Sequence, residues 1–100
     1  MVLELARIDI KPGSEAAFEA AVAEALPLFR AAKGCRSVEL RRGVERPSFY
    51  TLMIQWDTIE YHMTTFTGSD AFQTWRTLVG PHFAGPPAME HVGESVVPAF

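Results

Sequence analysis

The sequence predicts one α+β domain in which an antiparallel four-stranded sheet carries helices on one face. A chain of 100 residues has the size of a single domain, so we treat residues 1–100 as one unit. Apolar segments of strand length alternate with segments of helical periodicity in the order β-α-β-β-α-β. Hydrophobic residues make up 48% and charged residues 21% of the chain, which is a globular composition.

The first third of the chain reads as a strand followed by a helix. Val2–Ile10 is apolar and rich in strand-forming residues, and Lys11-Pro12-Gly13 interrupts it. Ser14 is the expected helix cap and Gly34 the expected helix end. Pro27 interrupts the helical pattern, so we expect a kink near it. The apolar stripe of this helix consists of Phe18, Val22, Ala25 and Phe29.

The rest of the chain reads as two strands, a broken helical segment and a last strand. The two strands are Ser37–Arg42 and Phe49–Trp56, joined by a turn. Gly68 separates two short helices, and Ser69 is the expected cap of the second. The last strand is expected over Ala88–Val96. Short connections and right-handed crossovers turn this order into the ferredoxin-like arrangement.

Both faces of the predicted sheet are largely apolar. The third strand carries Tyr50, Leu52, Ile54 and Trp56 on one face and Phe49, Thr51, Met53 and Gln55 on the other. An antiparallel sheet with one wet face should alternate apolar and polar residues instead. The helices can cover only one face, so a second copy of the chain is the expected cover of the other. The sequence therefore predicts a homodimer whose two sheets face each other.

Composition and motifs exclude several classes of function. The net charge is −3 and the basic residues are scattered, which argues against nucleic-acid binding. No segment resembles a signal peptide or approaches the ~20 apolar residues of a membrane span, so we expect a soluble cytoplasmic protein. Cys35 is alone, and His62, His82 and His91 form no metal motif. No glycine-rich dinucleotide motif is present, so we expect neither a cofactor nor a metal.

The segment Trp56–Arg76, WDTIEYHMTTFTGSDAFQTWR, concentrates residue types that are common in ligand sites. His62 is a candidate general base or hydrogen-bond donor to a phenol, or else a histidine at the edge of a helix. Arg76 is a candidate partner of an anion, or it pairs with an acid or lies in solvent. Trp75 and Phe66 are candidate walls for an aromatic ligand, or core residues.

Two further residues are candidate ligand contacts. Tyr50 could donate a proton to an oxygen intermediate if its strand face lines a pocket. His91 in the last strand could face either a pocket or a dimer interface. One sequence does not decide which face meets the helices.

Three segments carry a family resemblance: LARIDIKPGSEAAFEAA, VERPSFYTLMIQWD and the Trp56–Arg76 segment. Through them the chain resembles, over about Leu3 to Val96, the antibiotic-biosynthesis-monooxygenase-like family of dimeric α+β barrel proteins. The resemblance implies a homodimer with a ligand pocket in each subunit, between the sheet and the helices. Family members often carry a His after the Trp-Asp pair, and His62 occupies that place here.

The resemblance leads to three hypotheses about function. The first is a cofactor-independent monooxygenase of a polycyclic or phenolic molecule, with His62 as base or donor and Arg76 as anion partner. The second is a non-enzymatic small-molecule-binding or stress-response dimer. The third is haem degradation. Relatives of this fold that degrade haem share an Asn on the first strand, whereas the first strand of this chain has Arg7 and Asp9 and no Asn. Convergence of His62 and Arg76 on one cavity would favour the first hypothesis.

Overall fold

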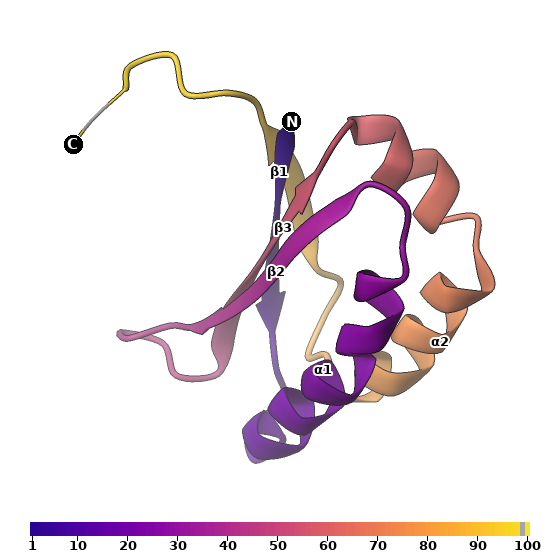
Figure 1. Ribbon diagram of the computed structural model, residues 1–100. Helices are drawn as coiled ribbons and strands as arrows, with labels where there is room; N and C mark the ends of the chain where they lie inside the picture. The colour runs from indigo at the N-terminus through magenta and orange to yellow at the C-terminus, as the bar shows by residue number, and fades with distance from the viewer. Residues whose placement is uncertain (99) are drawn as a thin grey trace.

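The computed structural model describes residues 1–98 and 100 and shows one sheet backed by helices (Figure 1). Its elements follow the predicted order. They are β1 (Val2–Asp9), α1 (Glu15–Arg30), β2 (Cys35–Arg42), β3 (Phe49–Trp56), the π-helix η1 (Tyr61–Phe66), α2 (Asp70–Val79), the 3₁₀ turn η2 (Gly80–His82) and β4 (Ala88–Val92).

The four strands lie in the order β2-β3-β1-β4, and every neighbouring pair is antiparallel. The helices all lie on one side of the sheet, and the opposite side is uncovered (Figure 1). This arrangement confirms the predicted ferredoxin-like α+β fold. Because β1 lies between β3 and β4, the first residues of the chain lie beside residues of both of these strands.

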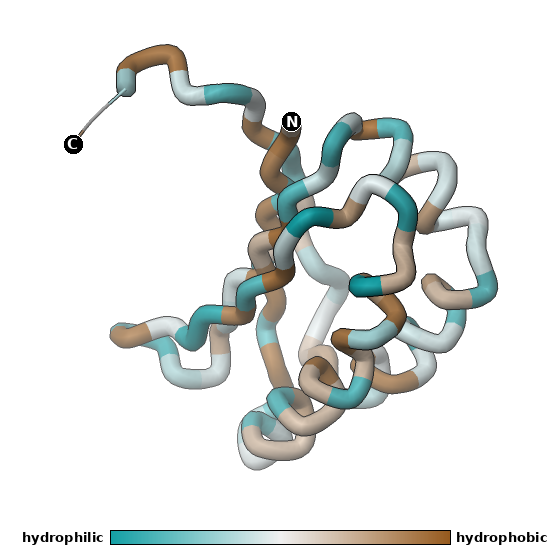
Figure 2. Tube along the Cα trace, viewed as in Figure 1, coloured by the Kyte–Doolittle hydropathy of each residue, from teal (hydrophilic) through white to brown (hydrophobic). Residues whose placement is uncertain are grey.

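The core lies between the sheet and the helices. The four stripe residues of α1 are buried, as predicted: Phe18, Val22, Ala25 and Phe29. They pack against the inward face of β3, whose four residues are at most 2% exposed: Tyr50, Leu52, Ile54 and Trp56. The helices therefore cover the Tyr50 face of the sheet, a choice that the sequence left open. Hydrophobic segments lie among hydrophilic ones along the sheet (Figure 2).

Two local details differ from the sequence-based expectation, and a third agrees with it. β4 ends at Val92 and not at Val96, because Gly93 follows it and the chain leaves the sheet. Ser14 makes no side-chain cap bond, and the Glu15 carboxylate accepts a hydrogen bond from the Gly13 N–H instead. Ser69 does cap α2, since its hydroxyl oxygen accepts from the Phe72 N–H at 3.3 Å.

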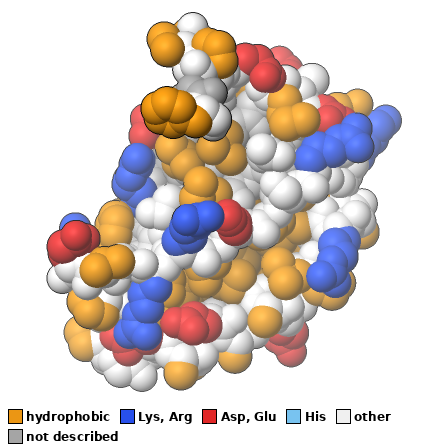
Figure 3. Space-filling view, turned by 60° about the vertical axis from the view of Figure 1, so that its left-hand side comes forward, with side chains coloured by type: hydrophobic (Ala, Val, Ile, Leu, Met, Phe, Trp, Pro, Cys, Tyr) orange, Lys and Arg blue, Asp and Glu red, His pale blue; other side chains and the backbone are white. Residues whose placement is uncertain are grey.

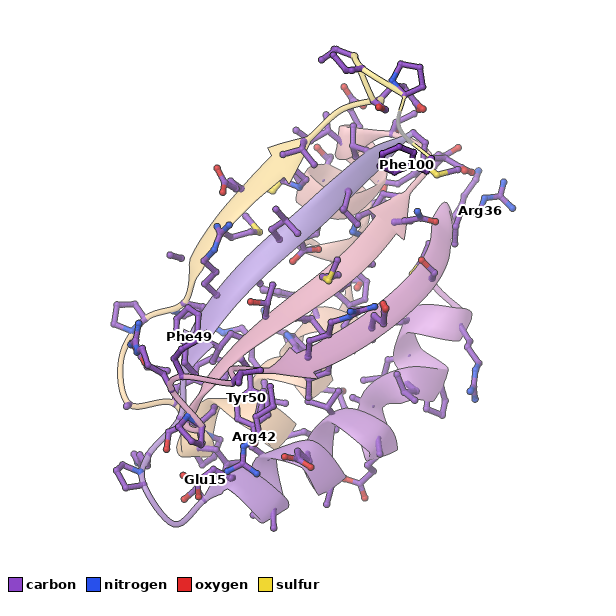
Figure 4. The ribbon with its side chains drawn as sticks, turned by 90° about the vertical axis from the view of Figure 1, so that its left-hand side faces the viewer. Glu15, Arg36, Arg42, Phe49, Tyr50 and Phe100 are labelled. Carbon is purple, nitrogen blue, oxygen red and sulfur yellow. The ribbon has the colours of Figure 1, made fainter. Side chains whose placement is uncertain are left out.

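The uncovered face of the sheet carries an apolar centre and a charged margin. Leu5 of β1 lies opposite Met53 of β3, and both side chains are half-buried. Hydrophobic side chains gather on this side between Lys, Arg, Asp and Glu (Figure 3). Phe100 lies near the end of the sheet where β1 begins (Figure 4). Among the helices of the described residues, none is long and apolar enough to cross a bilayer.

Candidate active site between the sheet and the helices

A cavity of about 840 Å³ lies between the sheet and the segment formed by η1 and α2. Most of its wall is apolar and aromatic: Ile54, Phe29, Phe66, Phe72, Trp75 and Phe83. The polar side chains on the wall are few: Glu4, His62, Thr67, Gln73, Arg76 and Thr77. An apolar cavity with a small number of polar groups is the usual form of a small-molecule site.

His62 is fixed in the wall by the π-helix that contains it. The Thr67 N–H donates to the His62 carbonyl, five residues back, at 3.1 Å. π-Helical turns often occur at functional sites because they redirect side chains. The His62 residue is only 4% exposed, and its ring stacks on the indole of Trp56. Its Nδ1 lies 2.8 Å from His91 Nε2, and its Nε2 lies 3.4 Å from Glu4 Oε1.

Glu4 is a buried carboxyl group on β1, with 5% of the residue exposed. The Trp56 indole N–H donates to its Oε1 at 3.0 Å. Burial raises the pKa of Glu4 to about 7, and the bond from Trp56 opposes that rise. At neutral pH Glu4 therefore exchanges readily between the carboxylic acid and the carboxylate, which is the property of a general acid or base.

Burial also lowers the pKa of His62 to about 4, with the neighbouring His91 as the second cause. His62 is therefore neutral at pH 7. Its 3.4 Å contact with Glu4 meets the distance criterion of an ion pair, but an ion pair would need a protonated imidazole. The contact is therefore not a fixed ion pair at neutral pH, because the lowered pKa keeps His62 uncharged and the raised pKa of Glu4 favours its protonated form more than in water.

Trp75 and Arg76 come from α2, and the structure places both at the cavity. Trp75 is 8% exposed and packs edge-to-face on Phe29, with ring centroids 5.0 Å apart. Arg76 is exposed, and its guanidinium lies 5.9 Å from the centre of the Phe72 ring. Within residues 1–98 and 100, Arg76 has no acidic partner, and Glu90 pairs with Arg7 instead. Arg76 is thus available to an anionic group at the edge of the cavity.

Tyr50 lies outside this cavity. Its hydroxyl donates to the Glu19 carboxylate at 2.6 Å, and its ring lines a separate hollow of about 460 Å³ beside α1 and β2. Burial, followed by the bond to Glu19, raises the pKa of Tyr50 to about 12. Tyr50 lies with Arg42 near one end of the sheet (Figure 4). The structure therefore does not bring Tyr50 together with the other candidates.

His91 is half-buried on β4 and reaches the cavity through His62. It lies opposite Glu4 in the β1–β4 pairing, so both side chains are on the helix side of the sheet. The structure thus brings His62, Arg76, Trp75 and Phe66 to one cavity, with His91 directly behind His62.

Sequence reasoning overlooked Glu4. The signal was present, because strand alternation puts Glu4 on the same face as Ala6 and Ile8. A single carboxylate on an otherwise apolar strand face needs a partner or a function. No residue near Glu4 in the sequence indicates its partners, because Trp56 and His62 lie 52 and 58 residues further along the chain.

Comparison with known proteins identifies the family. The model of the family described as antibiotic biosynthesis monooxygenase matches residues 1–78. The Bacillus subtilis protein YczJ is 35% identical over 91 residues, which cover 91% of this chain and 96% of that one. The chain therefore belongs to the antibiotic biosynthesis monooxygenase family, as the sequence resemblance indicated.

Solved structures agree. A Bordetella bronchiseptica protein that carries the family's name superposes with a TM-score of 0.93 at 47% identity, over 95% of this chain and 97% of that chain. SnoaB, a cofactor-independent oxygenase from Streptomyces nogalater, has a TM-score of 0.81 at 16% identity, over 96% of this chain and 94% of that one. At that identity SnoaB supports the fold alone.

Proposed function

We propose that this protein is a cofactor-independent monooxygenase of an aromatic hydroxyl compound with more than one ring. The observation that carries the proposal is that His62 and Arg76 line the same cavity, whose other walls are mainly aromatic. A flat apolar ligand would lie between Phe66 and Trp75. Its hydroxyl would face the polar end formed by His62 and Glu4, and an anionic oxygen would meet Arg76.

The chemistry needs a proton acceptor and a dry cavity. Loss of a proton converts the ligand into an electron-rich anion, which gives one electron to O₂. The carbon radical and superoxide then combine into a peroxide, and the proton removed first returns to it. Cleavage of the O–O bond with loss of the C–H proton gives a carbonyl and water, so a CH₂ group and O₂ become C=O and H₂O. Buried dipoles and a cation stabilise such an anion more strongly than water does.

The residues divide these tasks by position. His62 is neutral and buried, and it is the proposed base or hydrogen-bond donor to the ligand hydroxyl. Arg76 stabilises the anion by a charge-assisted hydrogen bond. Trp75 and Phe66 hold the ring system by stacking.

We also propose that the protein works as a homodimer. The uncovered sheet face combines half-buried apolar residues such as Leu5 and Met53 with a charged margin. Margin pairs include Arg7 with Glu90 and Asp9 with Arg46. A second copy placed on this face would remove its apolar centre from water, which supports sheet-to-sheet association.

Oxygen uptake by metal-free protein tests the proposal, with a panel of anthrones and hydroxynaphthoquinols as substrates. We expect uptake above the autoxidation background, and we expect His62→Ala and Arg76→Ala to reduce it by about 100-fold or more. His82→Ala is the matched control, because His82 lies outside the cavity. Uptake that both cavity variants retain would contradict the residue assignments. Aromatic binding without uptake by any substrate would instead identify a non-enzymatic binding protein.

A further inference from the structure

Glu4, His62 and His91 form a continuous line of side chains that begins at the cavity. Glu4 and His62 line the cavity, whereas His91 does not. Glu4 Oε1 lies 3.4 Å from His62 Nε2, and His62 Nδ1 lies 2.8 Å from His91 Nε2. Exposure increases along the line, since Glu4 and His62 are buried and His91 is half-buried. Three strands and one π-helix supply these groups and Trp56, so the line is a product of the tertiary fold.

The geometry is that of a chain and not of a metal centre. His62 turns a different ring nitrogen toward each neighbour, so the ligating atoms do not converge on one point. Among the described residues, no group of three or more His, Cys, Asp or Glu could hold a metal ion. A histidine with a proton donor or acceptor near each ring nitrogen can accept a proton at one side and release another from the opposite side.

The carboxyl group has one oxygen engaged and one free for a ligand. Oε1 receives the Trp56 N–H and contacts His62, whereas Oε2 has no hydrogen-bond partner in the described part of the chain. No side-chain oxygen or nitrogen of the described residues is both fully buried and unpartnered. Oε2 is therefore not fully buried, and Glu4 is one of the residues that line the cavity.

We propose that Glu4 is the group that takes the ligand's hydroxyl proton, and that His62 and His91 relay a proton from Glu4 toward the surface. This inference rests on the proposed function for its substrate class, an aromatic hydroxyl compound. It changes the role of His62 from direct base to relay. Glu4 is then the catalytic residue, and His62 and His91 act through it.

The relay balances in protons at each step. It starts with Glu4 protonated on Oε1, His62 on Nδ1 and His91 on Nδ1. The ligand O–H bond breaks as a new bond forms to Glu4 Oε2, while the Oε1 proton passes to His62 Nε2. The Nδ1 proton of His62 passes to His91 Nε2, and His91 releases its Nδ1 proton to water. The products are the ligand anion and one proton outside, with all three side chains still neutral.

The electrostatic surroundings agree with this scheme. The lowered pKa of His62 keeps its ring uncharged, and the raised pKa of Glu4 favours its protonated form, so the relay can start from neutral groups without a buried ion pair. Glu4 also affects Cys35 on β2. Burial, followed by the negative charge of ionised Glu4, raises the pKa of the Cys35 thiol, so the thiol stays neutral. Arg7 on β1 and Glu90 on β4 pair with each other on the opposite sheet face. At 3.4 Å the Glu4–His62 contact is longer than the ~2.7–3.2 Å of ordinary hydrogen bonds, so transfer needs a small carboxyl movement.

NMR of ¹⁵N-labelled imidazole rings tests the relay without any reaction. As Glu4 ionises with rising pH, we expect the ring proton of His62 to move from Nδ1 to Nε2, and that of His91 to move in the same transition. Glu4→Gln should abolish this shared transition, and the ring signals of His82 should not show it in either protein. Separate titrations of His62 and His91, or a transition that persists in Glu4→Gln, would overturn the proposal.

A second experiment follows proton transfer with alizarin, whose phenolate has a red-shifted absorption band. After rapid mixing below the first ionisation of free alizarin, we expect His91→Ala to slow phenolate formation about tenfold or more, with unchanged affinity. Millimolar imidazole should restore the rate in His91→Ala, whereas a merely structural defect would not respond to it. Unaltered rates, or a loss that imidazole does not repair, would overturn the relay. If both tests succeed and no substrate consumes oxygen, the relay stands and the oxygenase proposal fails. If oxygen is consumed and both tests fail, only the relay is wrong.

Discussion

The imidazole of His62 lies almost parallel to the indole of Trp56, with ring centroids 5.2 Å apart and planes inclined by 12°. The same indole donates its N–H to Glu4. Trp56 ends β3, so this one side chain sets the positions of a carboxyl group on β1 and an imidazole on η1. The polar end of the cavity therefore depends on a residue that is itself completely buried.

Trp56→Phe should disturb the site electrostatically as well as by packing. The variant keeps an aromatic ring but removes the N–H that stabilises the ionised form of Glu4, so the pKa of Glu4 should rise further. Lost packing and the lost hydrogen bond should lower the free energy of unfolding by about 2 kcal/mol. Carboxyl ¹³C NMR and urea unfolding measure the two effects. Trp75→Phe is the control, and an equal pKa change there would refute a specific role of Trp56.

The pH dependence of stability should reveal two opposing contributions. The pKa of Glu4 is raised from 4.5 to about 7 in the folded state, so the folded protein binds more protons there and Glu4 makes stability fall as pH rises through that window. The pKa of His62 is lowered from 6.5 to about 4, so the unfolded chain binds more protons and His62 makes stability rise with pH between those values. The two slopes overlap and largely cancel.

Single variants should separate these slopes. In Glu4→Gln only the His62 contribution remains. The free energy of unfolding of this variant should therefore increase by about 2 kcal/mol as the pH rises from the folded-state pKa of His62, about 4, to its unfolded-state pKa, 6.5. His62→Gln leaves Glu4, so its stability should decrease by a similar amount as pH rises toward neutrality. Urea unfolding at a series of pH values checks both. Parallel profiles in the two variants would show that the assigned pKa directions are wrong.

Gly34 should be intolerant of any side chain. Its φ is +81°, and an added Cβ would lie 2.5 Å from Cγ of Tyr61, so Gly34→Ala combines backbone strain with a clash. Gly13 has a φ of +92° but open space around the same position, so Gly13→Ala provides the strain alone. We expect a loss of about 1 kcal/mol for Gly13→Ala and about 2 kcal/mol more for Gly34→Ala. Equal losses by thermal unfolding would mean that Tyr61 moves aside at little cost.

Charge placed at the centre of the uncovered sheet face should dissociate the proposed dimer. Leu5→Lys or Met53→Lys would bury an unpaired ammonium between two sheets, which costs several kcal/mol. We expect the dimer dissociation constant to rise by about 100-fold or more in sedimentation experiments, with secondary structure retained. Thr74→Lys on the exposed side of α2 is the control. A wild-type protein that sediments as a monomer would contradict the dimer itself.

Tyr50→Phe should affect the fold and spare the cavity. It removes the 2.6 Å hydrogen bond to Glu19, so we expect a loss of about 1 kcal/mol in urea unfolding. The affinity for alizarin should stay unchanged, because Tyr50 lies outside the Glu4–Arg76 cavity. Weakened binding would show instead that the Tyr50 hollow takes part in ligand recognition.

The sequence by itself determined the fold class, the element order and much of the aromatic wall. The helical period of the Phe18–Phe29 stripe and the two-residue period of Phe49–Trp56 each depend on neighbours in sequence, so both could be recognised without coordinates. His62, Phe66, Trp75 and Arg76 could be selected because they lie on one short segment.

Only the tertiary structure decided which sheet face meets the helices and which groups share the polar end of the cavity. Both faces of β3 are apolar, so the two-residue period could not show which face the helices cover. In the structure the Tyr50 side chain faces α1, where its hydroxyl bonds to Glu19. Glu4 met Trp56, His62 and His91 because β1 pairs with β3 on one side and β4 on the other. Contacts of that kind depend on strand pairing between residues at least 40 positions apart, and no local pattern in a single sequence records such a pairing.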